Sequence, residues 1–190
     1  STGTTVTVSD MTQRFAPVPA DQPADELEQA LLARWREEDL FARTLAARAG
    51  ADPFVFFEGP PTANGKPGIH HVFARTIKDL FCRHRAMKGY LVQRKAGWDT
   101  HGLPVEIEVE KRLGISGKQD IEKLGVAEFN RLCRESVFTY RGDWERLSER
   151  IGYWLDYDDP YVTYTNDYVE SVWWALATLY RKGLLYRGHK

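Results

Sequence analysis

The sequence has few of the features that would classify a protein at first sight. Only two cysteines occur among 190 residues, Cys82 and Cys133, and their spacing suits neither a disulfide framework nor a metal site. Because unpaired cysteines are typical of a reducing compartment, we predict a cytoplasmic protein. The net charge is −1, so there is no global basic field, and any contact with nucleic acid must be local.

Long apolar runs are also missing. No stretch approaches the length of a membrane span, and no secretory signal pattern is visible, so we predict no membrane partner. Hydrophobic residues make up 43% of the chain, which is enough for a substantial core. We predict two parts: an N-terminal arm with an amphipathic helix over residues 1–50, and an α/β domain over residues 51–190.

The stretch from Phe54 to Ala74 is the centre of this organisation. It opens with apolar residues up to Glu58, a run that predicts a buried parallel strand. A loop rich in glycine and proline follows. From Gly68 the apolar residues recur at spacings of three and four, which predicts a helix to about Lys88. A strand, a glycine loop and a helix together place an anion at a helix N-terminus.

A second polar loop follows a second strand. Residues 90–93 are apolar enough for a parallel strand, and residues 97–102 form the polar segment after it. The carboxyl edge of a doubly wound sheet is where ligands bind. We therefore predict that both loops lie at this edge. A metal site could be assembled from His70, His71, Asp99 and His101, but adjacent histidines at a helix start should point their rings apart, so we predict none.

Other elements follow from the same patterns. An amphipathic helix is expected over residues 25–46. Residues 103–113 alternate like a strand, but Pro104 and the stop at Gly114 favour a helix. A short helix within 115–125, a long one over 127–151, a turn at 156–159 and a last helix over 167–182 complete the prediction. Trp173 and Trp174 are expected in the core, and the cations of helix 68–88 on a solvated face. The apolar residues after Gly183 resemble the start of a strand, so we expect the fold to continue beyond them.

Two common nucleotide-binding motifs do not fit the glycine loop. The dinucleotide fingerprint Gly-x-Gly-x-x-Gly occurs nowhere in the chain. A P-loop needs four residues between its glycines, whereas five separate Gly59 from Gly65, and Pro67 stands where the magnesium-binding hydroxyl should be. The composition alone therefore leaves the ligand open.

Two motifs do resemble a known family. Residues 59–65, Gly-Pro-Pro-Thr-Ala-Asn-Gly, precede Gly-Ile-His-His at 68–71, a variant of the His-Ile-Gly-His signature, and together they resemble class I aminoacyl-tRNA synthetases. Residues 97–106, Gly-Trp-Asp-Thr-His-Gly-Leu-Pro-Val-Glu, are similar to the isoleucyl-tRNA synthetases in particular. The resemblance covers about residues 25–190. In the signature, Gly68 replaces the first histidine and His70 replaces the glycine.

This resemblance implies a fold and an activity. The fold would be the first half of a Rossmann-like, doubly wound parallel sheet with an N-terminal helical extension. The enzyme would use ATP with Mg²⁺ to activate L-isoleucine as isoleucyl-adenylate, and would transfer it to the isoleucine tRNA. No DNA partner is implied, and zinc would bind only in parts outside this chain. The chain alone would be inactive or very weak. The alternative is a non-catalytic, synthetase-like nucleotide-binding module or paralogue.

The resemblance also implies roles for single residues. His71, with His70 beside it, would be catalytic. ATP would be bound by Asn64, Gly65, Gly68, His70 and His71. The amino acid and the adenylate would be bound by Gly59, Pro60, Asp99 and His101, where Asp99 pairs with the substrate ammonium.

Overall fold

The computed structural model describes residues 21–62 and 65–189. The chain divides into two compact units, residues 1–38 and residues 39–190. The described part of the first unit contains helix α2 (Ala24–Glu37), none of whose residues is buried. The N-terminal arm up to residue 20 lies outside the described residues.

The prediction of one helix over residues 25–46 is wrong. Helix α2 ends at Glu37, and a separate helix, α3 (Leu40–Ala46), begins after Asp39. Asp39 has a left-handed backbone with φ of 46°, which cannot continue a right-handed helix. Three consecutive acidic residues at positions 37–39 also oppose the negative end of the helix dipole, so a stop here is favoured.

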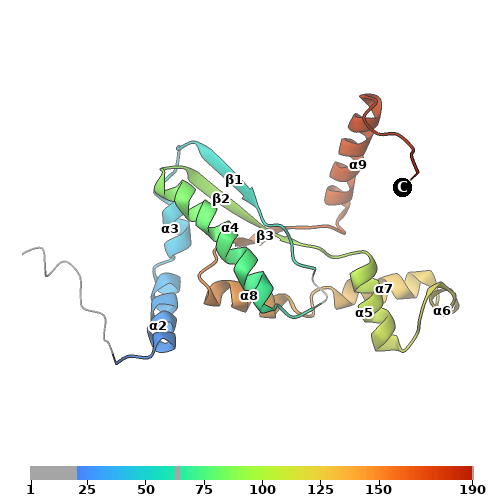
Figure 1. The fold of residues 1–190 in the computed structure, drawn as a ribbon, viewed down its shortest axis with the longest axis horizontal. Coiled ribbons are helices and arrows are strands. Elements are labelled where there is room, and N and C mark those ends of the chain that lie inside the picture. The colour runs from blue at the N-terminus through green and yellow to red at the C-terminus, as the bar shows by residue number, and fades with distance from the viewer. Residues whose placement is uncertain (1–20, 63–64, 190) are drawn as a thin grey trace, which may run out of the picture. The chain divides into compact units, whose positions relative to one another are not determined.

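A three-stranded parallel sheet forms the framework of the second unit (Figure 1). Its strands are β1 (Pro53–Phe57), β2 (Leu91–Trp98) and β3 (Asp156–Val162), in the order β1-β2-β3. Phe54 pairs with Val92, and the register between β2 and β3 shifts between Lys95 and Gly97. The predicted parallel α/β arrangement is therefore confirmed.

Helix α4 (Ile69–Met87) connects the first two strands and packs against β2 (Figure 1). It begins after Gly68, and the chain turns at Gly89, which has a φ of 96°. This confirms the predicted strand–loop–helix unit. Helix α5 (Leu103–Leu113) follows β2, and Gly114 ends it in the left-handed region, which glycine adopts at little cost. The short helix α6 (Lys118–Leu124) is also as predicted.

The predicted helix 127–151 is two helices, α7 (Val126–Ser136) and α8 (Arg141–Arg150). The hydroxyl of Ser136 donates to the Cys133 carbonyl at 2.8 Å, and that of Thr139 donates to the Ser136 carbonyl at 2.7 Å. Hydroxyl side chains that bond to nearby carbonyls compete with the helical pattern, and here they accompany its interruption.

The predicted turn at residues 156–159 is wrong, because β3 begins at Asp156. The side chain of Asp156 accepts a bond from the Asp158 N–H at 2.9 Å, so the local turn chemistry is present within a strand. Pro160 is tolerated because β3 lies at the edge of the three-stranded sheet.

Helix α9 (Asn166–Arg181) is as predicted, and Gly183 follows it with a φ of 70°. Trp173 and Trp174 are 66% and 68% exposed, so their predicted place in the core is wrong for this chain. The helix has the expected amphipathic pattern, but its apolar face has no buried residue. Residues 184–189 do not form the strand suggested by their composition.

Two clusters of buried side chains form the core of the second unit. One contains Trp98, Val137 and Trp144, and the other contains Ala96, Tyr153 and Leu155. Strand β2 contributes to both clusters, so the core lies along the strand that carries the second polar loop. Within the described ranges, no helix is long and apolar enough to cross a membrane.

Candidate functional site

The two polar loops lie side by side at the carboxyl ends of β1 and β2. Thr62 and Asp99 form an isolated parallel bridge, and the Asp99 N–H donates to the Pro61 carbonyl at 3.1 Å. The loop after β1 therefore continues alongside the loop after β2. This is the juxtaposition that the succession of strand and polar loop predicts.

His71 lies in the first turn of α4, and the backbone fixes its ring. The Nδ1 atom accepts a hydrogen bond from the Gly68 N–H at 2.9 Å, which is the reach-back half of a capping box. Because Nδ1 accepts, the proton of the neutral ring lies on Nε2. Burial lowers the pKa of His71 below its usual value, and the nearby His70 and Arg75 lower it further. His71 is therefore a neutral N–H donor near pH 7.

His70 is exposed, and its ring folds back over Gly68. The ring centroids of His70 and His71 are 3.8 Å apart, so the prediction that the two rings point apart is wrong. A Cβ atom at position 68 would lie 3.0 Å from Cε1 of His70. The glycine therefore leaves room for this imidazole. Consecutive side chains leave a helix in different directions, but the space over Gly68 allows the His70 ring to lie beside the His71 ring.

Trp144 of α8 connects the glycine loop with α4. Its Nε1–H donates to the Gly65 carbonyl at 2.8 Å, and its ring meets that of His71 edge-on with 4.6 Å between centroids. Trp144 lies within residues 127–151, which the sequence predicts to be helical, and neither loop motif includes it. Asn64, the neighbouring predicted ATP-binding residue, lies outside the described residues.

A buried carboxylate lies directly beneath the glycine loop. Glu58 follows β1 and is 1% exposed, and it accepts hydrogen bonds from Lys78 Nζ and from the Tyr153 hydroxyl. The Arg75 guanidinium is 4.0 Å from the same carboxylate. Burial raises the pKa of Tyr153, and the charge of Glu58 adds to this effect. The cluster joins the end of β1 to α4 and so holds both ends of the glycine loop.

The prediction of a solvated cationic face on α4 is wrong for two of its cations, Lys78 and Arg83, whereas Arg85 and Lys88 are exposed as predicted. Lys78 pairs with Glu58, and Arg83 donates to the Gly152 carbonyl and pairs with Asp79. The sequence does contain a signal for the Glu58 cluster. Glu58 ends an apolar run, and Arg75 and Lys78 are three positions apart, so they are neighbours on one side of the predicted helix.

Tyr161 of β3 crosses over β2 and is a second residue that sequence analysis missed. Its hydroxyl donates to the backbone carbonyl of Glu58, and its ring stacks on Tyr168 at 5.9 Å. Burial, with help from Tyr168, raises the pKa of Tyr161 to about 12. A Cβ atom at Gly97 would overlap the Tyr161 ring, so this position needs glycine. The shift in strand register occurs at the same place.

Asp99 and His101 remain accessible in the second loop. The His101 Nδ1 is 3.9 Å from the Asp99 carboxylate, and their side chains are 58% and 36% exposed. Gly59 is exposed and Pro60 is half-buried in the first loop. An accessible carboxylate beside a helix N-terminus can bind a ligand with one cationic and one anionic group.

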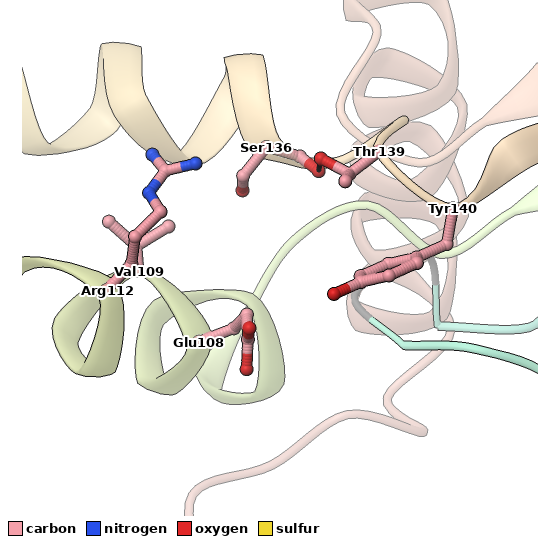
Figure 2. A pocket seen from close by; sticks show the side chains of 6 residues that line it. All are labelled: Glu108, Val109, Arg112, Ser136, Thr139 and Tyr140. Carbon is pink, nitrogen blue, oxygen red and sulfur yellow. Dashed lines mark hydrogen bonds between the residues drawn. The ribbon is translucent and has the colours of Figure 1, made fainter.

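Two cavities are lined in part by residues of α5. One of about 260 Å³ is lined by His101 together with residues of α5, α7 and the chain after β3. A smaller one of about 80 Å³ lies between α5 and the chain that joins α7 to α8, as Figure 2 shows. It is lined by Glu108, Val109, Arg112, Ser136, Thr139 and Tyr140. None of these six is a predicted site residue, and the smaller cavity is below the usual size of a ligand pocket. No group of three or more potential metal ligands occurs among the described residues.

Comparison with known proteins places this arrangement in a family. The profile described as "tRNA synthetases class I (I, L, M and V)" matches residues 30–190. The isoleucine–tRNA ligase of Bacteroides thetaiotaomicron is 56% identical over 165 residues, which are 86% of this chain and 14% of that protein. The isoleucine–tRNA ligase of Clostridium tetani is 55% identical over 165 residues, covering 87% of this chain and 16% of that protein. Isoleucine–tRNA ligase 2 of Bacillus cereus is 56% identical over 163 residues, which cover 86% of this chain and 16% of that protein.

A solved structure shares the fold. The crystal structure of the ternary complex of Agrobacterium radiobacter K84 agnB2 LeuRS-tRNA-LeuAMS superposes with a TM-score of 0.52 at 24% identity. The match covers 85% of this chain and 18% of that one. The chain spans 14% to 16% of the length of the three curated relatives above. The resemblance carried by the two loop motifs is confirmed: this chain belongs to the class I tRNA synthetases of the I, L, M and V group.

Proposed function

We propose that the chain is the first part of the catalytic domain of an isoleucine–tRNA ligase. The complete enzyme would join L-isoleucine to ATP and then transfer the isoleucyl group to the isoleucine tRNA. Identity of 55% to 56% to isoleucine–tRNA ligases supports this choice of amino acid. The observation that carries the chemistry is the fixed ring of His71 at the N-terminus of α4: its Nδ1 accepts from the Gly68 N–H, so that Nε2 carries the proton, and the loop before it runs beside the loop that bears Asp99.

The first step forms one bond and breaks another. A carboxylate oxygen of isoleucine attacks the α-phosphorus of ATP, the bond to the β-phosphate oxygen breaks, and pyrophosphate leaves with its Mg²⁺. Negative charge grows on the phosphate oxygens and on the leaving group. Donors that are already in position stabilise this charge without reorganising. His71 would supply one such donor through Nε2, and the free N–H groups at the start of α4 would supply others.

Other residues of the two loops would bind the rest of the substrates. Asp99 would pair with the ammonium of isoleucine, because its carboxylate is accessible and lies at the sheet edge. Gly59, Pro60 and His101 would surround the amino acid and the adenylate. Asn64, Gly65 and Gly68 would lie along ATP.

His70 would be a second imidazole for the phosphates. Its ring is exposed and stacks beside His71, and it occupies the space that a side chain at position 68 would take. The exchange of glycine and histidine in the signature would thus keep two imidazoles in the first turn. His70 would contribute less than His71, because no hydrogen bond from another described residue fixes its ring and exposed groups are screened by water.

The remaining assignments extend the same proposal. Residues 1–50 would be an N-terminal extension and residues 51–190 the first half of the catalytic domain. We place the enzyme in the cytoplasm, where its isoleucine tRNA is charged. Any zinc would bind in other parts of the protein.

Isoleucine-dependent pyrophosphate exchange by the full-length enzyme tests the proposal. His71→Ala should lower kcat by about a hundredfold, the scale of losing one transition-state donor. His70→Ala should lower kcat by roughly tenfold and leave the KM for ATP nearly unchanged. If the wild-type enzyme shows no isoleucine-dependent exchange, the non-catalytic module is favoured instead. If His70→Ala keeps the wild-type kcat, His70 has only a structural role.

A further inference from the structure

Trp144, from a distant part of the chain, contacts both the glycine loop and the first turn of α4. It lies on α8, 79 residues after Gly65, and is 2% exposed. Its indole N–H is bonded to the Gly65 carbonyl, and the edge-on contact with His71 reaches the first turn of α4. One side chain therefore touches the loop before the helix and the helix itself.

A second contact fixes the same side chain against α4. The Arg75 guanidinium lies 5.2 Å from the Trp144 ring, and it donates to the Ser148 hydroxyl at 2.9 Å. Arg75 is four positions after His71, so both lie on one face of α4. Trp144 and Ser148 are likewise four positions apart on α8. The two helices thus meet at two successive turns, and Trp144 cannot move without disturbing this contact.

We propose that Trp144 is a positioning residue for adenylate formation. This inference rests on the proposed function of the loop. The indole holds the Gly65 carbonyl and the His71 ring in a fixed relation, so that Nε2 of His71 faces the substrate phosphates. Trp144 itself does not touch the reacting atoms. A displacement of about 1 Å in a reacting geometry can lower a rate by about a hundredfold, so the hydrogen bond to Gly65 has a measurable effect on kcat.

A purely structural role makes a different prediction. Trp144 also belongs to the cluster with Trp98 and Val137, and a large buried side chain stabilises the fold wherever it lies. If packing were its only role, a replacement that preserves the ring volume would change stability and leave the chemistry intact. The N–H group separates the two roles, because it contributes to the contact with Gly65 and hardly to volume.

The experiment uses two replacements in the full-length enzyme. Trp144→Phe keeps an aromatic ring but removes the N–H donor. Benzothienylalanine at position 144, introduced by nonsense suppression, keeps the full bicyclic shape and also lacks the N–H. The control is Trp154→Phe, because the Trp154 ring stacks on Phe41 at 5.8 Å and lies under Arg83 at 4.5 Å, and neither partner belongs to the glycine loop.

Three quantities are measured for each variant: kcat and KM in isoleucine-dependent pyrophosphate exchange, the thermal midpoint, and the rate at which diethyl pyrocarbonate modifies His71 and His70. We expect both replacements at position 144 to lower kcat about tenfold at an unchanged KM for isoleucine. His71 should be modified several times faster, whereas the exposed His70 should react as before. Trp154→Phe can lower the thermal midpoint, but it should leave the kinetic constants and both modification rates near those of the wild type.

The outcomes distinguish this inference from the proposed function. If the wild-type enzyme exchanges pyrophosphate and the benzothienylalanine variant keeps its kcat within twofold, the positioning role is overturned. If the wild type shows no exchange, the proposed function fails, and the modification rate of His71 then decides alone. An unchanged rate in both replacements overturns the positioning role, and a faster one supports it. A phenylalanine variant that does not fold leaves the isosteric replacement to give the answer.

Discussion

Replacing Glu58 by glutamine should weaken the contacts that join the end of β1 to α4 on either side of the glycine loop. The glutamine keeps the shape and can still accept the bond from Tyr153, but it removes the negative charge that faces Lys78 and Arg75. The Lys78 side chain is 29% exposed and can turn to water, whereas Arg75 is 4% exposed and cannot. Removing one partner of a buried ion pair costs about 3–5 kcal/mol, because the other charge remains buried without compensation.

We take the lower end, about 3 kcal/mol, since Arg75 keeps its bond to Ser148 and its two aromatic neighbours. At about 1.4 kcal/mol for each factor of ten, this corresponds to roughly a hundredfold larger opening constant. Hydrogen exchange measured by mass spectrometry reports such local opening even in a large enzyme. Peptides from β1 and from the first half of α4 should exchange about a hundredfold faster in Glu58→Gln.

Asp159→Asn is the matched control. Asp159 pairs with Lys95 at the surface, and its side chain is 82% exposed, so the loss should be about 0–1 kcal/mol. Exchange of β1 and α4 should then stay within a few-fold of the wild type. If Glu58→Gln changes exchange as little as Asp159→Asn does, the buried carboxylate does not hold the loop and the reasoning is refuted.

Three further predictions follow from contacts at the same sheet edge. Gly68→Ala should push the His70 ring from its place and reduce kcat in pyrophosphate exchange by up to about tenfold, as His70→Ala does, and wild-type kinetics would contradict the proposed role of that ring. Asp99→Asn should lower kcat/KM for isoleucine about ten- to a hundredfold at an unchanged KM for ATP, since a charge-assisted bond contributes about 1.5–3 kcal/mol, and an unaltered constant for isoleucine would exclude the ammonium contact. Tyr161, whose folded pKa is raised to about 12, stabilises the fold fully below pH 10, and this contribution is lost as the pH rises toward 12. In urea unfolding, the difference in the free energy of unfolding between the wild type and Tyr161→Phe should therefore shrink between pH 10 and 12. A difference that stays constant over this range would contradict the prediction.

The sequence by itself determined the local elements around the site. Apolar residues ending at Glu58, a run of breakers and a helical spacing after Gly68 define strand, loop and helix without tertiary information. Helix ends at Gly114 and Gly183 were predictable because these glycines adopt the left-handed backbone that ends a helix. The parallel order of the first two strands followed from the helix between them, and the two loop motifs pointed to the family.

Breaks within the helices were less visible. Asp39 and the segment after Ser136 interrupt apolar patterns that continue across them, so periodicity alone joined what the backbone separates. Periodicity also failed to predict that Trp173 and Trp174 are exposed. An amphipathic pattern states that a face can be buried, but it does not state against what.

Only the tertiary structure decided how the site is held together. The hydroxyl of Tyr161 reaches a carbonyl 103 residues away, and the indole of Trp144 reaches one 79 residues away. Such contacts depend on which strands and helices become neighbours, and no local pattern carries that information. The His70 ring returns to His71 only because position 68 has no side chain to block it. Propensity and spacing fix the backbone of the loop, whereas packing between distant segments fixes the direction of its functional groups.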